Sequence, residues 1–446
     1  MVYVPNTDND RKKMLDRIGV DSFDELIEKI PAGIRLTEDL NLPPKLSEYE
    51  IVKLLEDYAA MNVSAKTHTC FMGGGSYDHF IPSIVNSITA RPEYKTAYTP
   101  YQAEVSQGTL QTMYEYQSMI CDLTGMDVTN ASMYDGASSL AEACLLSSFQ
   151  NKRTEFAIAG TLNPHYREVL ETVCAGRKLT FTEYVLEDGT CDIEALRAAM
   201  DDTISAVVVQ QPNFYGTLED VNELEKIAHG TKKTMFITSV DPISLGLLKA
   251  PGEYNADIVT AEGQSLGIPM NFGGPYLGIF STTQKLVRKI PGRLSGVTQD
   301  TDGNRGFVLT LQTREQQIKR EKATSNICSN QGLMMVTATV YLATMGKQGI
   351  KEVAEQSFNR AHYLSARINE LPGFSLMNDK PFFREFLVNT PVPPAEIIEA
   401  AQEAGILAGI DTTKFENCKS GLLIAVTEKR TKDEMDKLVN VLKKFA

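Results

Sequence analysis

The sequence has few of the features that mark metal sites, disulfide frameworks or membrane proteins. Its 446 residues include seven cysteines and five histidines. The cysteines are odd in number and lack CxxC spacing, while the histidines show no metal-ligand spacing and no HExxH motif. No apolar run approaches the ~20 residues of a membrane span, and the N-terminus lacks the core of a signal sequence. We therefore expect a cytoplasmic protein without a metal centre.

An excess of positive charge is also missing. The chain carries 44 basic and 57 acidic residues, for a formal net charge of -13. This balance argues against binding to nucleic acid or to an anionic membrane, because both need a basic surface. A small molecule or another protein is the expected partner. At this length the chain exceeds one compact core, so a large and a smaller domain are expected.

Residues 1–65 are predicted to form a helical N-terminal arm. Apolar residues recur at helical spacing in two stretches of residues 7–30, with Asp21 or Ser22 placed to cap the second helix and Pro31 to end it. Residues 51–62 form another such stretch. Three short helices have little core of their own, so we expect this arm to pack on a larger body or on a partner.

Beyond the arm, the pattern predicts an α/β domain over residues 66–330 and an α+β domain over residues 331–446. Apolar runs at 156–160, 204–212 and 234–242 alternate with amphipathic helices. Such alternation is typical of a parallel-rich sheet with helices on both faces. In the last 116 residues, helical stretches are instead followed by two isolated strands, at 382–390 and 421–428, which is typical of a smaller α+β lobe.

Four long segments carry a resemblance to a known family. They are residues 71–117 (FMGGGSYDHF and onward), 130–143 (NASMYDGASSLAEA), 240–278 and 291–331, which ends TREQQIKREKATSNICSNQ. All four resemble the glycine decarboxylase P-protein of the glycine cleavage system. In many bacteria this protein is split into two chains, and the present chain is similar to subunit 1, the α chain. The resemblance implies the fold type I, aspartate aminotransferase-like plan of pyridoxal-phosphate enzymes.

The lysine that holds the cofactor in this fold is missing. Residues 256–275, ADIVTAEGQSLGIPMNFGGP, read as a buried strand that enters a glycine-rich loop. In the sister half of the family the lysine lies in the matching segment, and alignment through Ile268 and Pro269 puts Gln264 in its place. A glutamine amide cannot form an imine. The resemblance therefore implies that this chain binds no cofactor covalently.

Other cofactor positions are retained as vestigial candidates. Asp241 lies where the fold usually places the acid that pairs with the pyridine nitrogen, and Ser138 and Ser139 lie at the helix start where the phosphate usually rests. The alternative is that Asp241 merely caps a helix that starts at Pro242 and that the serines belong to an ordinary helix turn. The missing lysine favours this alternative.

Two polar segments are candidates for the wall of a pocket shared with the β chain. The first is YTPYQAEVSQG, where a structural loop is the alternative, and the second is TSNIC, where a solvated charged helix is the alternative. Tyr77 and His79 of the glycine-rich turn at 71–80 are further contributors to consider, because that turn lacks the GK[ST] of a nucleotide loop. The shared-pocket candidates are Tyr98, Tyr101, Gln102, Glu104, Ser106, Gln107, Asn326 and Cys328.

The resemblance also implies an activity and an assembly. The family is a glycine dehydrogenase (aminomethyl-transferring), an oxidoreductase with a disulfide acceptor, which decarboxylates glycine on pyridoxal phosphate and passes the aminomethyl group to the lipoyl arm of H-protein. The cofactor would lie on subunit 2 (β) of an α2β2 heterotetramer, with T-protein and dihydrolipoamide dehydrogenase as indirect partners. Two alternatives stay open. One is a free-standing pyridoxal enzyme that uses Lys249 or Lys285, and the other is a non-catalytic scaffold.

Overall fold

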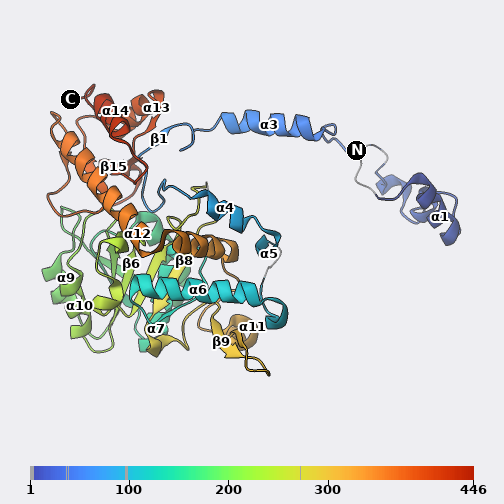
Figure 1. Ribbon diagram of the computed structural model, residues 1–446, viewed down its shortest axis with the longest axis horizontal. Coiled ribbons are helices and arrows are strands. Elements are labelled where there is room, and N and C mark those ends of the chain that lie inside the picture. The colour runs from blue at the N-terminus through green and yellow to red at the C-terminus, as the bar shows by residue number, and fades with distance from the viewer. Residues whose placement is uncertain (1–4, 37, 39, 96–98, 272) are drawn as a thin grey trace. The chain divides into compact units, whose positions relative to one another are not determined.

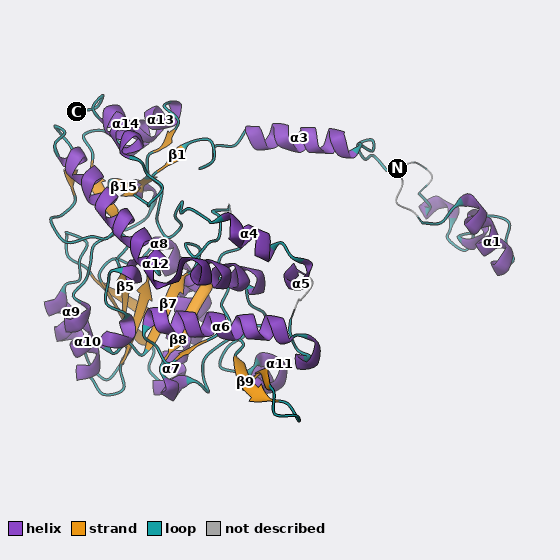
Figure 2. Ribbon diagram, in the orientation of Figure 1, coloured by secondary structure: helices purple, strands orange, loops and turns teal. Residues whose placement is uncertain are grey.

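The computed structural model describes residues 5–36, 38, 40–95, 99–271 and 273–446. The chain divides into two units, Met1–Ser64 and Ala65–Ala446. The ribbon diagrams label the helices and strands of each unit (Figures 1 and 2). No helix among the described residues is both long enough and apolar enough to cross a membrane.

The first unit consists of short helices without a buried core. It contains α1 (Asp8–Ile18), α2 (Phe23–Leu26), the 3-10 helix η1 (Ala32–Ile34) and α3 (Glu48–Ala60), and none of their described residues is buried. The hydroxyls of Thr7, Ser22 and Ser47 cap α1, α2 and α3. The second helix is shorter than predicted, because it ends at Leu26 and does not continue to Ile30. An apolar stripe alone does not hold a short helix when no core packs against it.

The centre of the second unit is a seven-stranded sheet in the order β2-β8-β7-β6-β5-β3-β4. Only β8 runs antiparallel to its neighbours, and the other strands run parallel to one another. The strands are β2 (Val128–Thr129), β3 (Glu155–Ala159), β4 (Thr180–Tyr184), β5 (Ile204–Gln211), β6 (Met235–Val240), β7 (Ile258–Glu262) and β8 (Gly278–Thr282).

Helices cover both faces of this sheet, as the alternation of strands and helices predicts. Ala157 and Val207 face one core, whereas Phe156 and Ala206 face the other, because successive residues of a strand point to opposite faces. The first core is covered by α6 (Gln107–Thr124), α9 (Ile193–Ala199), α10 (Val221–Gly230) and the first part of α12 (Gly332–Asn369). The second is covered by α7 (Gly136–Asn151) and α8 (Pro164–Cys174). The α/β fold is confirmed.

The C-terminal residues build a smaller antiparallel sheet in the order β11-β12-β15-β14. Its elements are β11 (Ser375–Leu376), β12 (Glu385–Asn389), β14 (Ile410–Asp411), β15 (Leu422–Ala425), α13 (Pro394–Glu403) and α14 (Lys432–Leu442). Helix α12 joins this lobe to the large sheet and kinks at Gly346, where φ is 60°. Its residues before the kink pack in the large core and its last turns in the small one. The boundary at residue 330 stays a prediction.

The remaining elements lie around the two sheets. Strand β1 (Thr69–Cys70) pairs with β13 (Ile406–Leu407) of the C-terminal lobe, and β9 (Ser295–Gln299) forms a hairpin with β10 (Arg305–Leu309). Short helices α4 (Ser83–Thr89), α5 (Pro92–Lys95) and α11 (Gln316–Lys319) complete the unit. Helix α4 packs on α12, and the β9–β10 hairpin packs on α6.

Candidate functional site

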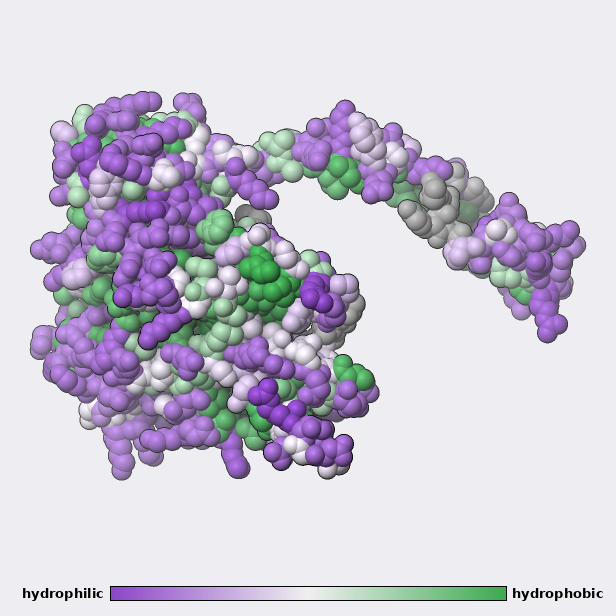
Figure 3. Space-filling view, in the orientation of Figure 1, coloured by the Kyte–Doolittle hydropathy of each residue, from purple (hydrophilic) through white to green (hydrophobic). Residues whose placement is uncertain are grey.

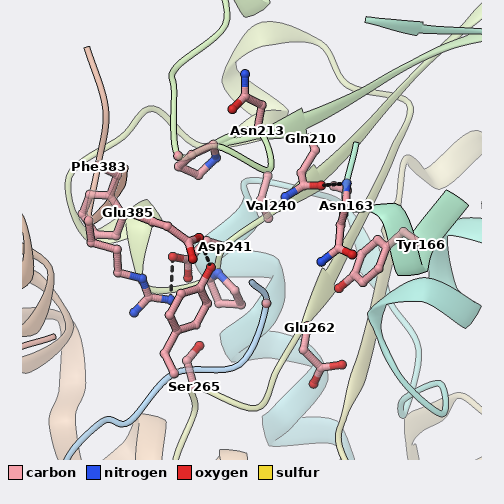
Figure 4. Close-up of a pocket in the computed structure, with 17 residues that line it drawn as sticks. Asn163, Tyr166, Gln210, Asn213, Val240, Asp241, Glu262, Ser265, Phe383 and Glu385 are labelled. Carbon is pink, nitrogen blue, oxygen red and sulfur yellow. Dashed lines mark hydrogen bonds and ion pairs between the residues drawn. The ribbon is translucent and has the colours of Figure 1, made fainter. Parts of the chain in front are cut away.

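The segments that would hold pyridoxal phosphate in this fold converge on one small cavity. It has a volume of about 40 Å³ and lies at the ends of β5, β6 and β7, beside the start of β12 (Figure 4). That volume accommodates one or two water molecules, each of which occupies ~30 Å³ in the liquid. Its walls come from both sheets of the unit, and Asp241 and Glu262 are among the residues that line it.

The side chain of Glu262, the last residue of β7, lies against the first residue of α7. One carboxylate oxygen accepts a hydrogen bond from the backbone N–H of Gly136 at 2.9 Å, and the other accepts from the N–H groups of Gln264 at 2.9 Å and Leu277 at 3.0 Å. Part of Glu262 borders the cavity, yet desolvation raises the pKa of its carboxyl to about 8. A carboxylate of the chain itself thus stands at the helix terminus where a cofactor phosphate would rest.

The two serines at the same helix start are also engaged. Asp135 caps α7 by accepting the backbone N–H of Ser138 at 2.7 Å. The buried hydroxyl of Ser139 donates to the backbone carbonyl of Asp135 at 2.9 Å. Gly136 leaves no space for an added group, because a Cβ there would lie 2.3 Å from the Tyr166 hydroxyl. The N–H groups of Gly136, Ser138 and Ser139 in the first turn of α7 are therefore all bonded within the chain.

Asp241, which follows β6, pairs with a cation from the C-terminal lobe. Its Oδ2 lies 2.7 Å from Nη2 of Arg384, a side chain that is 2% exposed. Its Oδ1 accepts the backbone N–H of Ile243 at 3.0 Å, so the predicted capping contact is present together with the ion pair. The Arg384 guanidinium lies 3.7 Å from the centroid of the Tyr77 ring and contacts the imidazole of His79. Arg384 thus stands where a pyridinium nitrogen would meet Asp241.

Gln264, the residue in place of the lysine, is fully bonded within the chain. Its Oε1 accepts the backbone N–H of Tyr77 at 2.9 Å, and its Nε2 donates to the carbonyls of Ile268 at 2.7 Å and Tyr77 at 3.2 Å. The amide supplies an acceptor as well as donors, whereas a lysine ammonium has donors only. Gln264 therefore holds the glycine-rich turn against the loop that follows β7.

The glycine-rich turn at 71–80 wraps a carboxylate of the chain instead of a phosphate. Glu385, the first residue of β12, accepts the backbone N–H of Gly74 at 2.6 Å and the hydroxyl of Tyr77 at 2.8 Å. Burial raises the pKa of the Glu385 carboxyl to about 7. Gly216, with φ at 84°, lies so close that an added Cβ would sit 1.8 Å from the Glu385 carbonyl oxygen. The two lobes are in backbone contact here.

These residues do not fit pyridoxal phosphate. The phosphate position holds Glu262, the pyridine partner Asp241 is paired with Arg384, and Gln264 offers no amine. The residues that line the cavity, all from the described part of the chain, include no lysine. Lys249 borders a different groove, between α6 and α12. We call this region the closed pocket and define it by Tyr77, Asp241, Glu262, Gln264, Arg384 and Glu385.

A second constellation brings together the two polar segments that the sequence singles out. Arg293, 4% exposed, precedes β9. Its Nη1 donates to Oδ1 of Asn330 at 2.7 Å, and its Nη2 donates to the carbonyl of Cys328 at 3.1 Å and contacts the Tyr101 hydroxyl at 3.5 Å. The guanidinium also lies 5.6 Å from the centroid of the Tyr101 ring. We call Tyr101, Arg293, Cys328 and Asn330 the Arg293 cluster.

The candidates for the shared pocket are found in several environments. Tyr101 is 53% exposed, and Gln102, Glu104, Asn326 and Cys328 are exposed as well. Ser106 is half-buried before α6. The side chain of Gln107 bonds both the N–H and the carbonyl of Phe307 at 2.8 Å and so fastens α6 to β10. Tyr98 lies outside the described residues. Asn326 and Cys328 stay candidates with Tyr101, whereas Gln107 has a structural contact.

Sequence reasoning missed the residues that close the pocket and the arginine that joins the polar segments. Arg384 and Glu385 interrupt an otherwise apolar stretch, FFREFLVNT, and this charged pair within a strand pattern was the available signal. Glu262 ends an apolar strand in the same way. Arg293 lies in a loop and has no local pattern that would single it out. Its role depends on contacts with segments far away in the sequence.

Comparison with known proteins identifies the family of the chain. Residues 1–442 match the family described as "Glycine cleavage system P-protein". The chain is 55% identical to a "Probable glycine dehydrogenase (decarboxylating) subunit 1" of Chlorobium luteolum and 52% identical to one of Chloroherpeton thalassium, with 100% of each chain covered. A crystal structure of a glycine decarboxylase (P-protein) in inhibitor-bound form matches with a TM-score of 0.90 and 41% identity over 100% of both chains.

More distant structures share the fold alone. The Lactobacillus brevis glutamate decarboxylase matches with a TM-score of 0.69 at 14% identity, covering 92% of this chain and 96% of that one. The aspartate aminotransferase-like fold and the likeness to the P-protein, both expected from the sequence, are confirmed. The chain belongs to the glycine cleavage system P-protein family.

Proposed function

We propose that this chain is the cofactor-free half of a split glycine dehydrogenase (decarboxylating). A companion subunit 2 would hold pyridoxal phosphate, which supplies the electron sink for decarboxylation. The Arg293 cluster, with Asn326 beside it, would complete the wall of the companion's pocket. The lipoyl arm of H-protein is the expected acceptor of the aminomethyl group, and α2β2 is the expected assembly.

The single observation that carries the proposal is the closed pocket. In this chain Gln264 stands at the position of the lysine anchor, and Glu262 stands where the cofactor phosphate would bind. Arg384 pairs with Asp241, the residue that would contact the pyridine nitrogen. Replacing these buried partners by a ligand would leave charges unpaired, which is strongly unfavourable. A family activity that needs the cofactor must therefore draw it from another chain.

Exposed apolar side chains around the Arg293 cluster support a companion chain as its cover. Val105 at the start of α6 is 76% exposed and Phe80 before α4 is 61% exposed. Apolar surface is visible near α4 and near the N-terminal end of α6 (Figure 3). Exposed apolar surface can mark a protein contact. The other members of the group are Ile84, Tyr114, Val297, Ile318 and Leu333.

The test is to assemble the chain with its companion subunit and to measure glycine decarboxylation with lipoylated H-protein. Tyr101→Phe and Asn326→Ala are each expected to lower kcat ~10-fold or more, because a positioned polar group in the active centre is lost. Tyr114→Phe is the control, because it removes a tyrosine hydroxyl on α6 while keeping the ring that lies tilted against Phe307.

The outcomes separate three possibilities. Loss of activity in Tyr101→Phe and Asn326→Ala, with Tyr114→Phe unaffected, supports a contribution to the pocket. Unchanged kinetics in all three variants would mean that the chain is a scaffold. Decarboxylation by the isolated chain would show that it holds its own cofactor, for which Lys249 and Lys285 are the lysines to examine.

A further inference from the structure

Arg293 is a buried arginine whose guanidinium hydrogen-bonds three residues, none of them acidic. Among the described residues, the Arg293 guanidinium forms no ion pair. Burial raises the pKa of the Glu315 carboxyl, and the positive charges of Arg314 and Arg293 only partly oppose that shift. A buried charge without an ion-pair partner is unfavourable, so its hydrogen bonds to the chain must stabilise it. The contacts of Arg293 lead to two exposed segments.

The backbone around Arg293 is itself firmly fixed. Its carbonyl accepts the N–H of Ala131 at 2.8 Å, and the carbonyl of Pro291 accepts the side-chain amide of Asn130 at 3.0 Å. Gly292 has φ at 74°, and a Cβ there would lie 2.9 Å from that same amide. The loop before β9 is thus bound to residues 130–132, between β2 and α7. Arg293 projects from a rigid base.

The segments that Arg293 contacts lack regular secondary structure. Residues 325–331 contain no helix or strand, and Tyr101 lies in an irregular stretch before the 3-10 helix η2 (Ala103–Val105). Asn330 is held on its other side by the hydroxyl of Ser132, which accepts its Nδ2 at 2.8 Å. One planar guanidinium therefore connects the two segments, a geometry that a lysine ammonium does not reproduce.

We propose that Arg293 is a positioning residue for the shared active centre, fixing Tyr101 and the 326–330 segment relative to each other. The inference rests on the proposed function, because it takes Tyr101 and Asn326 to face the companion's pocket. Arg293 itself is buried and acts only through the groups that it holds. Its loss would misplace both segments by small distances while the core elements keep their packing.

The experiment compares Arg293→Lys and Arg293→Ala with Arg153→Lys in the assembled enzyme. Arg153 is a matched control far along the sheet, where its guanidinium binds the carbonyls of Ile204 at 2.9 Å and Lys232 at 2.8 Å. We expect Arg293→Ala to lower kcat ~100-fold, as misplacement of groups around a reaction centre does. Arg293→Lys should recover part of this loss, and Arg153→Lys should keep full activity at a similar loss of thermal stability.

Two further measurements identify positioning as the cause. Combining Arg293→Ala with Tyr101→Phe should lower kcat no further than Arg293→Ala alone, because both changes remove one shared function. In the isolated chain, Arg293→Ala should speed thiol labelling of Cys328 severalfold, since the exposed Cys328 loses its backbone anchor, whereas Arg153→Lys should not.

The results distinguish this inference from the proposed function. If Tyr101→Phe lowers kcat but Arg293→Lys and Arg293→Ala match the unmodified enzyme, the positioning role is wrong and the proposed function stands. If Tyr101→Phe and Asn326→Ala have no effect, the proposed function fails first. Equal labelling of Cys328 in Arg293→Ala and in the unmodified chain would also overturn the positioning role.

Discussion

The closed pocket and the Arg293 cluster are both polar constellations, but they are built in opposite ways. In the closed pocket, charged and amide groups pair with other parts of the chain, as Asp241 does with Arg384 and Gln264 does with Tyr77, although Nε of Arg384 has no hydrogen-bond partner. In the Arg293 cluster, one buried cation holds exposed groups such as Tyr101. Saturated groups stabilise a fold, whereas exposed groups on a rigid support can act on a ligand. We therefore interpret the closed pocket as a structural remnant and the Arg293 cluster as the region with the proposed function.

The largest difference between the two regions is expected from added methyl groups. Gly216→Ala in the closed pocket would bring Cβ to 1.8 Å from the Glu385 carbonyl oxygen. We expect it to lower the free energy of unfolding by ~3 kcal/mol or more. Gly108→Ala, in the first turn of α6, meets nothing within 4 Å and should be tolerated. Urea unfolding of both variants measures this, and equal stability would contradict tight closure of the pocket.

A pH dependence of stability should arise in the closed pocket. Because the pKa of Glu385 is raised to about 7, the folded chain binds more protons than the unfolded chain between about pH 4.5 and 7. The free energy of unfolding should therefore fall as the pH rises through this window, with a share of ~2 kcal/mol from Glu385. Glu262, with a pKa of about 8, adds to the same trend.

Glu385→Gln should flatten this profile, and Glu104→Gln in the exposed segment should leave it unchanged. Urea unfolding from pH 4.5 to 8 provides the measurement. A profile in Glu385→Gln that still falls as steeply as in the unmodified chain would show that Glu385 is not the group that titrates.

The smallest effect is expected from restoring the lysine. Gln264→Lys should not create a cofactor site, because Glu262 still occupies the start of α7 and Arg384 still pairs with Asp241. Absorbance spectra with added pyridoxal phosphate, before and after borohydride, should match those of Gln264→Met. A reduced adduct at position 264 would show that the pocket opens readily and that only the lysine was missing.

The α/β fold could be predicted from the sequence, because alternating apolar strands and helices are local patterns that identify the sheet. The assignment of Gln264 to the lysine position came from the resemblance to the sister half of the family. The length of α2 was wrong, because it depends on packing that a stripe of apolar residues does not guarantee. The closure by Arg384 and the bridge through Arg293 depend on residues that are 143 and 192 positions from their partners, and no local pattern encodes such pairs.

The central claim is that the cofactor of the assembled enzyme belongs to the companion subunit. Borohydride reduction of the complex with pyridoxal phosphate, followed by peptide mapping, tests it directly. The account predicts that the reduced cofactor is attached to a lysine of the companion subunit, with one cofactor for each pair of chains. A reduced cofactor on any lysine of this chain would contradict the account.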